Sequence, residues 1–175
     1  MHLPWRDVAP GPGPVISTSI TEAETTKLRE FAADAVVLEI GAAYGYSAVV
    51  MGLAGAQVTS VDPHDWLNSY TSCMANLGVY GVKAEVHRAS SWQMLPRFAE
   101  QGRMFDLVLI DGDHAEQTVA HDLQWASKLL TRGGIVAVHD YLETCCCPGV
   151  QAALDAALGP AGPHEMVDTL RLVRP

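Results

Sequence analysis

The chain has 175 residues, of which 49% are hydrophobic, so it is long and apolar enough to form one domain with a sizeable core. It carries 11 Lys and Arg against 20 Asp and Glu, which gives a formal net charge of −9. Binding to a phosphate backbone requires clustered basic residues, whereas these are scattered, so the charge disfavours nucleic acid as a partner.

The first 14 residues contain four prolines and no apolar run. That pattern fits neither a signal peptide nor a membrane anchor, so we expect a cytoplasmic protein that does not bind a membrane. The prolines and glycines favour an extended or mobile backbone. We therefore expect residues 1–18 to be a flexible lead-in and residues 19–175 to form the domain.

Four cysteines occur, Cys73 and the run Cys145–Cys147. Their spacing matches neither a disulfide framework nor a paired-cysteine zinc motif, so we expect thiols without disulfide bonds. Three adjacent cysteines cannot all point to one site. Loop packing is therefore the simplest role for the run, with a place in a pocket wall or a soft-metal site as alternatives.

Helical and strand patterns alternate after the lead-in. Ser19 or Thr21 can cap a helix that extends to Phe31, because acidic residues occupy its first turn, where the helix dipole favours them. The apolar run Ala35–Ile40 predicts a strand buried on both faces, and the Gly133–Gly134 pair is expected to end the longest helix. The other expected elements are helices over Tyr46–Leu53, Ser69–Leu77, Trp92–Glu100, Ala115–Leu130 and Gly149–Leu158, and strands over Gln57–Val61, Ala84–His87, Phe105–Ile110, Ile135–Val138, Glu165–Asp168 and Leu170–Val173.

Strands that alternate with helices imply parallel pairing with right-handed crossovers. The seven expected strands therefore indicate an α/β fold, a Rossmann-like, doubly wound, mostly parallel sheet in a single domain, with a C-terminal antiparallel hairpin. In such a sheet, ligands bind outside the carboxyl ends of the strands, where the strand order reverses.

The first strand of the expected sheet runs into the glycine turn Gly41-Ala42-Ala43-Tyr44-Gly45. Glycine is needed where the backbone turns sharply from strand to helix, or where a ligand approaches the main chain. An ordinary strand-to-helix turn has the same composition, so the two glycines alone do not distinguish it from a ligand-binding turn. A nicotinamide dinucleotide site needs Gly-x-Gly-x-x-Gly, which is missing here, so a nicotinamide oxidoreductase is disfavoured.

Val-Leu-Glu-Ile-Gly-Ala-Ala-Tyr-Gly-Tyr-Ser, followed by Val-Thr-Ser-Val-Asp, resembles motifs one and two of the class I S-adenosylmethionine-dependent methyltransferases. The resemblance extends from about Val36 to Val173. It implies that Gly41 and Gly45 wrap the methionine part of the cofactor, and that the Asp62 carboxylate accepts hydrogen bonds from both ribose hydroxyls. Apart from the resemblance, Asp62 is a polar residue at a strand end.

Ser91 and Trp92 follow the third strand, where similar enzymes hold the adenine with a small polar residue and an apolar or aromatic neighbour. Ser90 or Ser91 also fits as the cap of the next helix, and the two roles do not exclude each other. The full set of cofactor contacts that the resemblance implies is Glu39, Gly41, Ala42, Tyr44, Gly45, Ser47, Asp62, Pro63, Ser91, Trp92 and Asp111.

Acidic and imidazole side chains follow the fourth and fifth strands, in the segments 111–114 and 139–140. Parallel neighbouring strands would bring these clusters together, and a divalent cation neutralises crowded carboxylates efficiently. We predict Asp111 and Asp140 as metal ligands, with His139 as a third ligand or turned elsewhere. Oxygen ligands favour Mg²⁺, whereas an imidazole shifts the preference toward Mn²⁺, Fe²⁺ or Zn²⁺.

Asp-Gly-Asp-His and His-Asp-Tyr after these strands, with Asp-Leu in the helix between them, resemble the branch that includes macrocin O-methyltransferase-like small-molecule methyltransferases. Some enzymes of that branch depend on magnesium. The resemblance implies that Asp111 is the first metal ligand, His114 the general base and Asp140 a further ligand. Metal-dependent members carry an acidic residue or an asparagine beside that last ligand, where this chain has His139.

The sequence thus predicts an S-adenosylmethionine-dependent methyltransferase that O-methylates a small molecule, with or without a divalent cation, and with Asp111 and His114 as catalytic residues. Methyl transfer from a sulfonium requires an aligned nucleophile and removal of its proton, which His114 can accept. A cation would help a hydroxyl to ionise. The alternative role for His114 is a helix cap or a hydrogen-bonding group at the sheet edge.

Two other functions fit the same residues. A metal-independent methyltransferase could act on nitrogen or on an RNA base, with Asp111 and His139 orienting the acceptor. A cofactor-binding module without turnover also fits, because fold does not fix function and only about Met1–Ile20, or a partner subunit, could form a lid over the acceptor. The acceptor, the metal requirement and the oligomeric state, a homodimer included, stay open.

Overall fold

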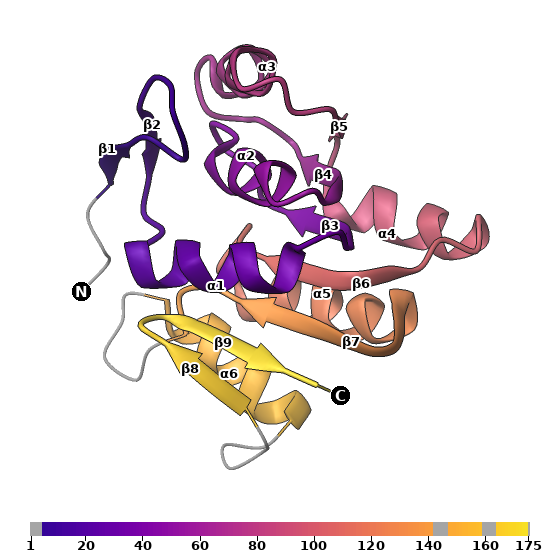
Figure 1. The fold of residues 1–175 in the computed structure, drawn as a ribbon. Coiled ribbons are helices and arrows are strands. Elements are labelled where there is room, and N and C mark those ends of the chain that lie inside the picture. Colours follow the sequence, from indigo (N-terminus) through magenta and orange to yellow (C-terminus); the bar gives the residue numbers. More distant parts are fainter. Residues whose placement is uncertain (1–4, 142–146, 159–163, 175) are drawn as a thin grey trace.

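The computed structural model describes residues 5–141, 147–158 and 164–174, whose main feature is a seven-stranded sheet with helices on both faces (Figure 1). The elements are β1 (Arg6–Val8), β2 (Ile16–Thr18), α1 (Glu22–Ala32), β3 (Val36–Ile40), α2 (Tyr46–Leu53), β4 (Gln57–Asp62), α3 (Ser69–Val79), β5 (Ala84–Arg88), α4 (Ser91–Glu100), β6 (Phe105–Ile110), α5 (Glu116–Leu129), β7 (Leu130–Val138), α6 (Pro148–Leu158), β8 (His164–Val167) and β9 (Leu170–Val173). The sheet order is β5-β4-β3-β6-β7-β9-β8. Neighbours among β3 to β7 are parallel, and β9 is antiparallel to β7 and β8. The predicted doubly wound sheet and its C-terminal hairpin are confirmed.

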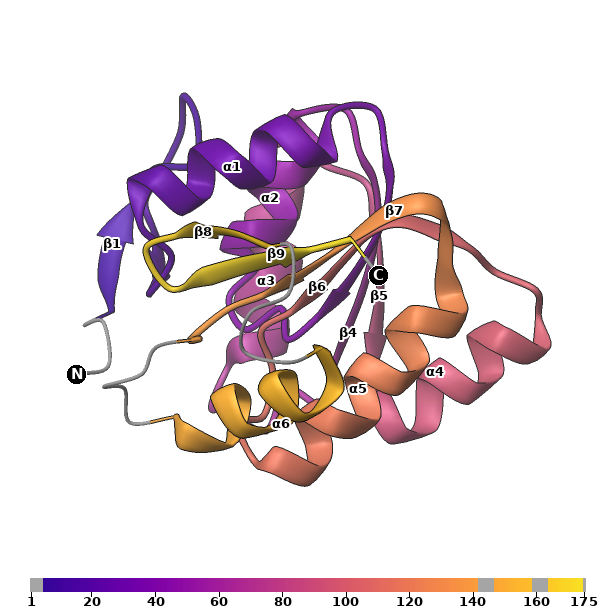
Figure 2. The same cartoon turned by 90° about the horizontal axis from the view of Figure 1, so that it is seen from below.

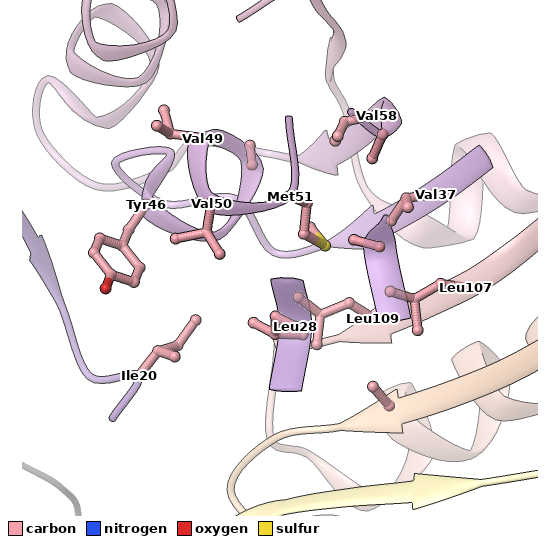
Figure 3. Close-up of a cluster of buried hydrophobic side chains, with 14 of the residues drawn as sticks. Ile20, Leu28, Val37, Tyr46, Val49, Val50, Met51, Val58, Leu107 and Leu109 are labelled. Atoms are coloured by element: carbon pink, nitrogen blue, oxygen red, sulfur yellow. The ribbon is translucent and has the colours of Figure 1, made fainter. Parts of the chain in front are cut away.

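Helices α1, α2 and α3 cover one face of the sheet, and α4, α5 and α6 cover the other (Figures 1 and 2). Successive strand residues point to opposite faces, so the sheet supplies both cores. Val37 and Leu109 pack with α1 and α2 in the cluster drawn in Figure 3, whereas Leu38 and Val108 pack against α4 to α6. All four side chains are fully buried, as the unbroken apolar runs predicted.

From α1 onward, the helix and strand bounds lie within two residues of those expected from sequence, except at the start of β7. Helix α1 begins after Thr21, which forms a capping box with Glu24. Within the described ranges, no helix combines the length and the apolar character needed to cross a bilayer.

The Gly133–Gly134 pair does not end α5, which corrects the sequence prediction. Helix α5 ends at Leu129, and Leu130 already pairs with Phe105 of β6. The two glycines instead serve the irregular start of β7. Gly133 has a φ of +85°, and a Cβ on Gly134 would lie 2.9 Å from the carbonyl oxygen of Asp106.

The segment expected to be a flexible lead-in contains the antiparallel pair β1–β2, in which Arg6 lies opposite Thr18. Proline lacks an N–H but keeps its carbonyl, and two of these carbonyls accept hydrogen bonds from the domain. The Arg29 guanidinium donates to Pro10, and the Tyr80 hydroxyl donates to Pro14. Composition alone did not indicate these contacts. The boundary of the domain at residue 19 stays a prediction.

The strand order reverses between β3 and β6, and the turn after β3 lies at that point. Gly41 there has a φ of +94°, and a Cβ on Gly41 would overlap the carbonyl oxygen of Asp111, which follows β6. Only glycine therefore allows the backbone of this turn to lie directly against the end of β6.

We expect Gly41→Ala to lower the free energy of unfolding by clearly more than Gly102→Ala. Both glycines have positive φ, but a Cβ on Gly102 meets no atom within 4 Å, so that variant measures backbone strain alone, about 1–2 kcal/mol. The difference between the two losses in urea unfolding reports the overlap with Asp111. Equal losses would show that the overlap relaxes without cost.

Candidate active site

A cavity of about 840 Å³ opens at the carboxyl ends of β3, β4, β6 and β7. Most of the predicted site residues line it, namely Gly41, Ala42, Tyr44, Ser47, Asp62, Pro63, Ser91, Trp92, Asp111, His114 and Asp140. Glu39, Gly45 and His139 are not among the lining residues. The chain thus brings the glycine turn, the acid of β4 and the acids after β6 and β7 to one cavity of a size that suits a small ligand.

The Asp62 carboxylate is hydrogen-bonded to the turns around it. One oxygen accepts the N–H groups of Ala42 and Ala43, both at 2.8 Å, and the other accepts the N–H of His64 at 2.6 Å. A carboxylate offers about four acceptor positions, so these bonds leave roughly one. Asp62 can therefore accept both hydroxyls of a ribose only if one backbone N–H gives up its bond.

Glu39 lies behind the glycine turn, where it is fully buried. Its carboxyl group accepts hydrogen bonds from the hydroxyls of Ser47 and Ser60. Burial raises the pKa of Glu39 to about 7, although both serine hydroxyls act in the opposite direction. Through Ser47 and Ser60, Glu39 therefore connects the helix and the strand beside the glycine turn. Its contact with the cofactor stays a prediction.

The wall after β5 consists of the first turn of α4 and the facing side of α5. Ser90 is the N-cap residue of α4. Trp92 is half exposed and stacks on His121, with ring centroids 3.7 Å apart. Asp122 lies beside them, buried but lining the cavity, and its Oδ1 is 2.9 Å from His121 Nδ1.

Sequence reasoning missed several residues of the wall. Asp122 is not among the predicted site residues, because an acid on an amphipathic helix gives no signal of its own. Trp5, Tyr44 and Trp66 form an aromatic cluster that also lines the cavity, with ring centroids 5.4–6.4 Å apart. Only Tyr44 was predicted, since Trp5 directly precedes β1 and Trp66 lies in the β4–α3 loop, where the sequence contains no motif.

Three carboxylates converge on His139, which directly follows β7. Its Nε2 lies 3.2 Å from Glu24 Oε2. Its Nδ1 lies 3.0 Å from Asp111 Oδ1 and 3.2 Å from Asp140 Oδ2, although neither contact has the alignment of a hydrogen bond. Glu24 also accepts the N–H and hydroxyl of Thr169, so α1 is joined to the edge of the sheet through this cluster.

The carboxylates keep His139 positively charged. Burial alone would lower the pKa of His139, but Asp111, Asp140 and Glu24 together hold that pKa well above its usual 6.5. Burial would likewise raise the pKa of Glu24 and that of Asp140, yet the imidazoles lower both. A histidine in this state carries a proton on each ring nitrogen, and its charge balances acids that would otherwise repel one another.

His114 lies at the cavity wall between Asp140 and Cys147. Its Nε2 is 3.1 Å from Asp140 Oδ2, and its Nδ1 is 3.1 Å from Cys147 Sγ. The hydrogen bond to Asp140 raises the pKa of His114, although burial acts against it. The side chain is about one third exposed and faces the cavity, so a ligand can reach it. The helix cap of α5 is Ala115, not His114.

The predicted metal ligands Asp111, His139 and Asp140 do lie together. One ligand atom from each falls within 4.8 Å of the other two. A ligating imidazole has to be neutral at the nitrogen that binds the metal, whereas the surrounding acids favour a proton there. Metal binding by this group therefore stays a prediction. Cys145 and Cys146, the other members of the cysteine run, lie outside the described residues.

A protein-family model described as "Methyltransferase domain" matches residues 38–141, from β3 to the segment after β7. The chain belongs to this methyltransferase family. The match contains the glycine turn, Asp62, Asp111 and His114, whereas Trp5, residues 17–20 and Cys147 of the cavity wall lie outside it. The predicted class, an S-adenosylmethionine-dependent methyltransferase, is confirmed.

Similar solved structures include several O-methyltransferases. A putative O-methyltransferase from Klebsiella pneumoniae is 19% identical, with a TM-score of 0.70, over 87% of this chain and 80% of that one. The O-methyltransferase from Bacillus cereus in complex with SAH is 19% identical, with a TM-score of 0.69, over 89% and 82%. TomG from Streptomyces achromogenes, in complex with SAM, is 20% identical, with a TM-score of 0.67, over 87% and 79%. At these identities the likeness shows the fold alone. No curated protein sequence matches this methyltransferase.

Glu39→Gln should change how stability depends on pH. Because the pKa of about 7 in the folded state exceeds the usual 4.5, folded Glu39 keeps a proton that the unfolded chain loses between these values. The free energy of unfolding of the wild type, relative to the variant, should fall by about 3 kcal/mol as the pH rises through that window. Urea unfolding of both proteins at a series of pH values measures this difference. Parallel plots of the free energy of unfolding against pH would contradict the prediction.

Proposed function

We propose that this methyltransferase transfers the methyl group of S-adenosylmethionine to a hydroxyl oxygen of a small molecule. The observation that supports the proposal is that one cavity is lined by the glycine turn and Asp62 as well as by His114 and Asp140. That arrangement puts the groups suited to a cofactor and the groups suited to proton removal around one volume. The similar O-methyltransferases, TomG of tomaymycin synthesis among them, support the same acceptor class.

The turn after β3 fits the cofactor because its backbone is open to the cavity. Gly41 and Ala42 line the cavity, and Asp62 offers roughly one further acceptor position beside them. We assign the methionine part to Gly41 and Gly45 and the ribose to Asp62. Ser91 and Trp92 flank the adenine, and the buried Asp122 carboxyl is a further acceptor on that wall. When bound, S-adenosylmethionine supplies the activated methyl group.

His114 is the group that accepts the proton of the acceptor hydroxyl. It faces the cavity and is oriented by Asp140, which has a positive φ of 59° and lies almost fully buried. Asp140 also stabilises the imidazolium that forms when the proton arrives. Alignment of the hydroxyl with the methyl group supplies much of the remaining rate enhancement.

A divalent cation at Asp111, His139 and Asp140 belongs to the proposal only as an addition. Such an ion would lower the pKa of a bound hydroxyl, so deprotonation of the acceptor would depend less on His114. The position of His139 among three acids favours a second candidate, a metal-independent enzyme in which the imidazolium balances their charge. A chelator should abolish turnover of a metal-assisted enzyme and leave turnover of a metal-independent enzyme unchanged.

We expect Asp62→Ala to weaken binding of S-adenosylmethionine by about tenfold or more, because the variant loses charge-assisted hydrogen bonds to the ribose. Asp65→Ala is the matched control, since Asp65 is an exposed acid at the same cavity. Isothermal titration calorimetry of both variants measures the effect. Equal affinities in the two variants would show that Asp62 does not contribute to cofactor binding.

His114→Ala should reduce methyl transfer by about a hundredfold or more and change cofactor affinity little, as expected for a general base. Because the pKa of His114 is raised, its neutral form gains population only above pH 6.5, and kcat/KM should rise with pH beyond that value. The assay screens phenols, sugars and other hydroxyl compounds with methyl-labelled cofactor. A fully active variant, or transfer to nitrogen compounds alone, would contradict the proposal.

A further inference from the structure

The cavity at the carboxyl ends of the strands has an acidic lining. Among the described residues that line it there is no Lys or Arg, and the residues outside the described ranges contain neither. Apart from His114, the charged side chains of this lining are therefore all carboxylates, namely Asp62, Asp65, Asp111, Asp113, Asp122 and Asp140. Walls that carry one sign of charge focus the electrostatic potential inside a cleft. The cavity therefore attracts cations and repels anions.

Groups of the protein already engage most of these acids. Asp111 and Asp140 adjoin the protonated ring of His139, and Asp122 Oδ1 lies 2.9 Å from His121 Nδ1. The acid of β4 accepts three backbone N–H groups. Bound S-adenosylmethionine would add only a single net positive charge. The cavity therefore stays acidic when the cofactor is present.

The two remaining acids, Asp65 and Asp113, are exposed. In the described part of the chain, the ion pairs of Lys and Arg involve other acids than these two. Asp113 directly precedes His114, in the loop between β6 and α5. An acid without a basic side chain beside it and the proposed base are thus neighbours at one cavity.

The Asp113 carboxylate is held in place before any ligand binds. Its Oδ1 accepts the N–H of Ala115 at 3.2 Å, and its Oδ2 accepts the hydroxyl of Thr118 at 2.8 Å. The hydrogen bond from Thr118, above all, lowers the pKa of Asp113, so this acid stays ionised. A carboxylate offers about four acceptor positions, and these two bonds leave roughly two for a ligand.

We propose that the methyl acceptor carries a protonated amine as well as its hydroxyl group, and that Asp113 selects it by binding the ammonium group. The hydroxyl at His114 and the ammonium at Asp113 are then bound by adjacent residues of one loop. An acceptor with a carboxylate, phosphate or sulfate would meet uncompensated negative charge, so the cavity rejects it. This inference rests on the proposed function, because it concerns the acceptor of the same cavity.

The hydrogen bond from Ala115 also fits a purely structural role, in which Asp113 stabilises the start of α5. Asp113→Asn separates the two roles. Asparagine keeps an oxygen that can accept the same N–H, but it has no charge with which to bind an ammonium group. A structural role predicts no difference between charged and neutral ligands, whereas selection by charge predicts a large one.

The test is isothermal titration calorimetry of the full chain, saturated with S-adenosylhomocysteine, near neutral pH. The probes are three phenols of similar shape: the cation meta-(aminomethyl)phenol, the neutral meta-ethylphenol and the anion meta-hydroxybenzoate. An aromatic frame suits the cavity because Trp5, Tyr44 and Trp66 line it. We expect the cation to bind about tenfold more tightly than the neutral phenol, through a charge-assisted hydrogen bond, and the anion to bind most weakly.

Added salt should reduce this preference, because the acid that carries it is exposed. A wild-type protein that binds meta-(aminomethyl)phenol no more tightly than meta-ethylphenol overturns the proposal, and so does the absence of any binding. This comparison needs no variant, so it stands even if a substituted protein fails to fold.

Variants assign the preference to one residue. Asp113→Asn should lower the affinity for the cation to that for the neutral phenol and leave the neutral phenol unaffected. Glu116→Gln is the matched control, because it removes the charge of an exposed acid in the first turn of α5 that does not line this cavity. It should keep the preference. A folded Asp113→Asn protein that keeps the full preference overturns the assignment to Asp113.

Binding and methyl transfer separate this inference from the proposed function. Transfer to hydroxyl compounds without a preference for cations would overturn the inference and leave the proposed function intact. Selective binding of the amine, with no transfer to any hydroxyl compound, would support the cation preference and contradict the proposed function.

Discussion

The backbone of Gly41 lies directly against the carbonyl group of Asp111, and this contact fixes the distance between the two sides of the active site. β3 and β6 are neighbours in the sheet, but their chains leave it in opposite directions. The turn after β3 therefore faces the cavity next to the acids that follow β6 and β7. A side chain at position 41 would push the ends of β3 and β6 apart, and the glycine turn would no longer adjoin His114.

Bringing these strand ends together concentrates negative charge, and His139 balances it. Glu24, Asp111 and Asp140 all lie within 3.2 Å of its ring nitrogens. Burying three carboxylates without a cation would be costly, so a protonated ring contributes both charge and orientation. Asp140 in turn orients His114. The chain of contacts from Thr169 through Glu24 and His139 to His114 connects the C-terminal hairpin and α1 with the proposed base.

The sequence was sufficient to predict the sheet, because its central strands contain apolar runs such as residues 107–110 and its turns carry glycine. It also placed Asp62, Asp111 and His114 after strands whose ends line the cavity, and their roles there stay predictions. It could not reveal Glu24, which sits in an ordinary capping box and meets His139 through the fold, 115 residues away. The prediction that Gly133–Gly134 ends α5 was wrong for a local reason. Paired glycines are typical of helix ends, but they also permit the irregular start of β7. Trp5 and Asp122 reach the cavity through tertiary packing alone.

A structure of the full chain with S-adenosylhomocysteine bound would test the assignment of the cavity most directly. It should show the ribose hydroxyls at the Asp62 carboxylate, with one of the N–H groups of Ala42 or Ala43 released from it. The sulfur should face the side of the cavity that holds His114 and Asp140. A nucleoside bound outside this cavity, or a sulfur turned away from His114, would contradict the arrangement on which the proposed chemistry depends.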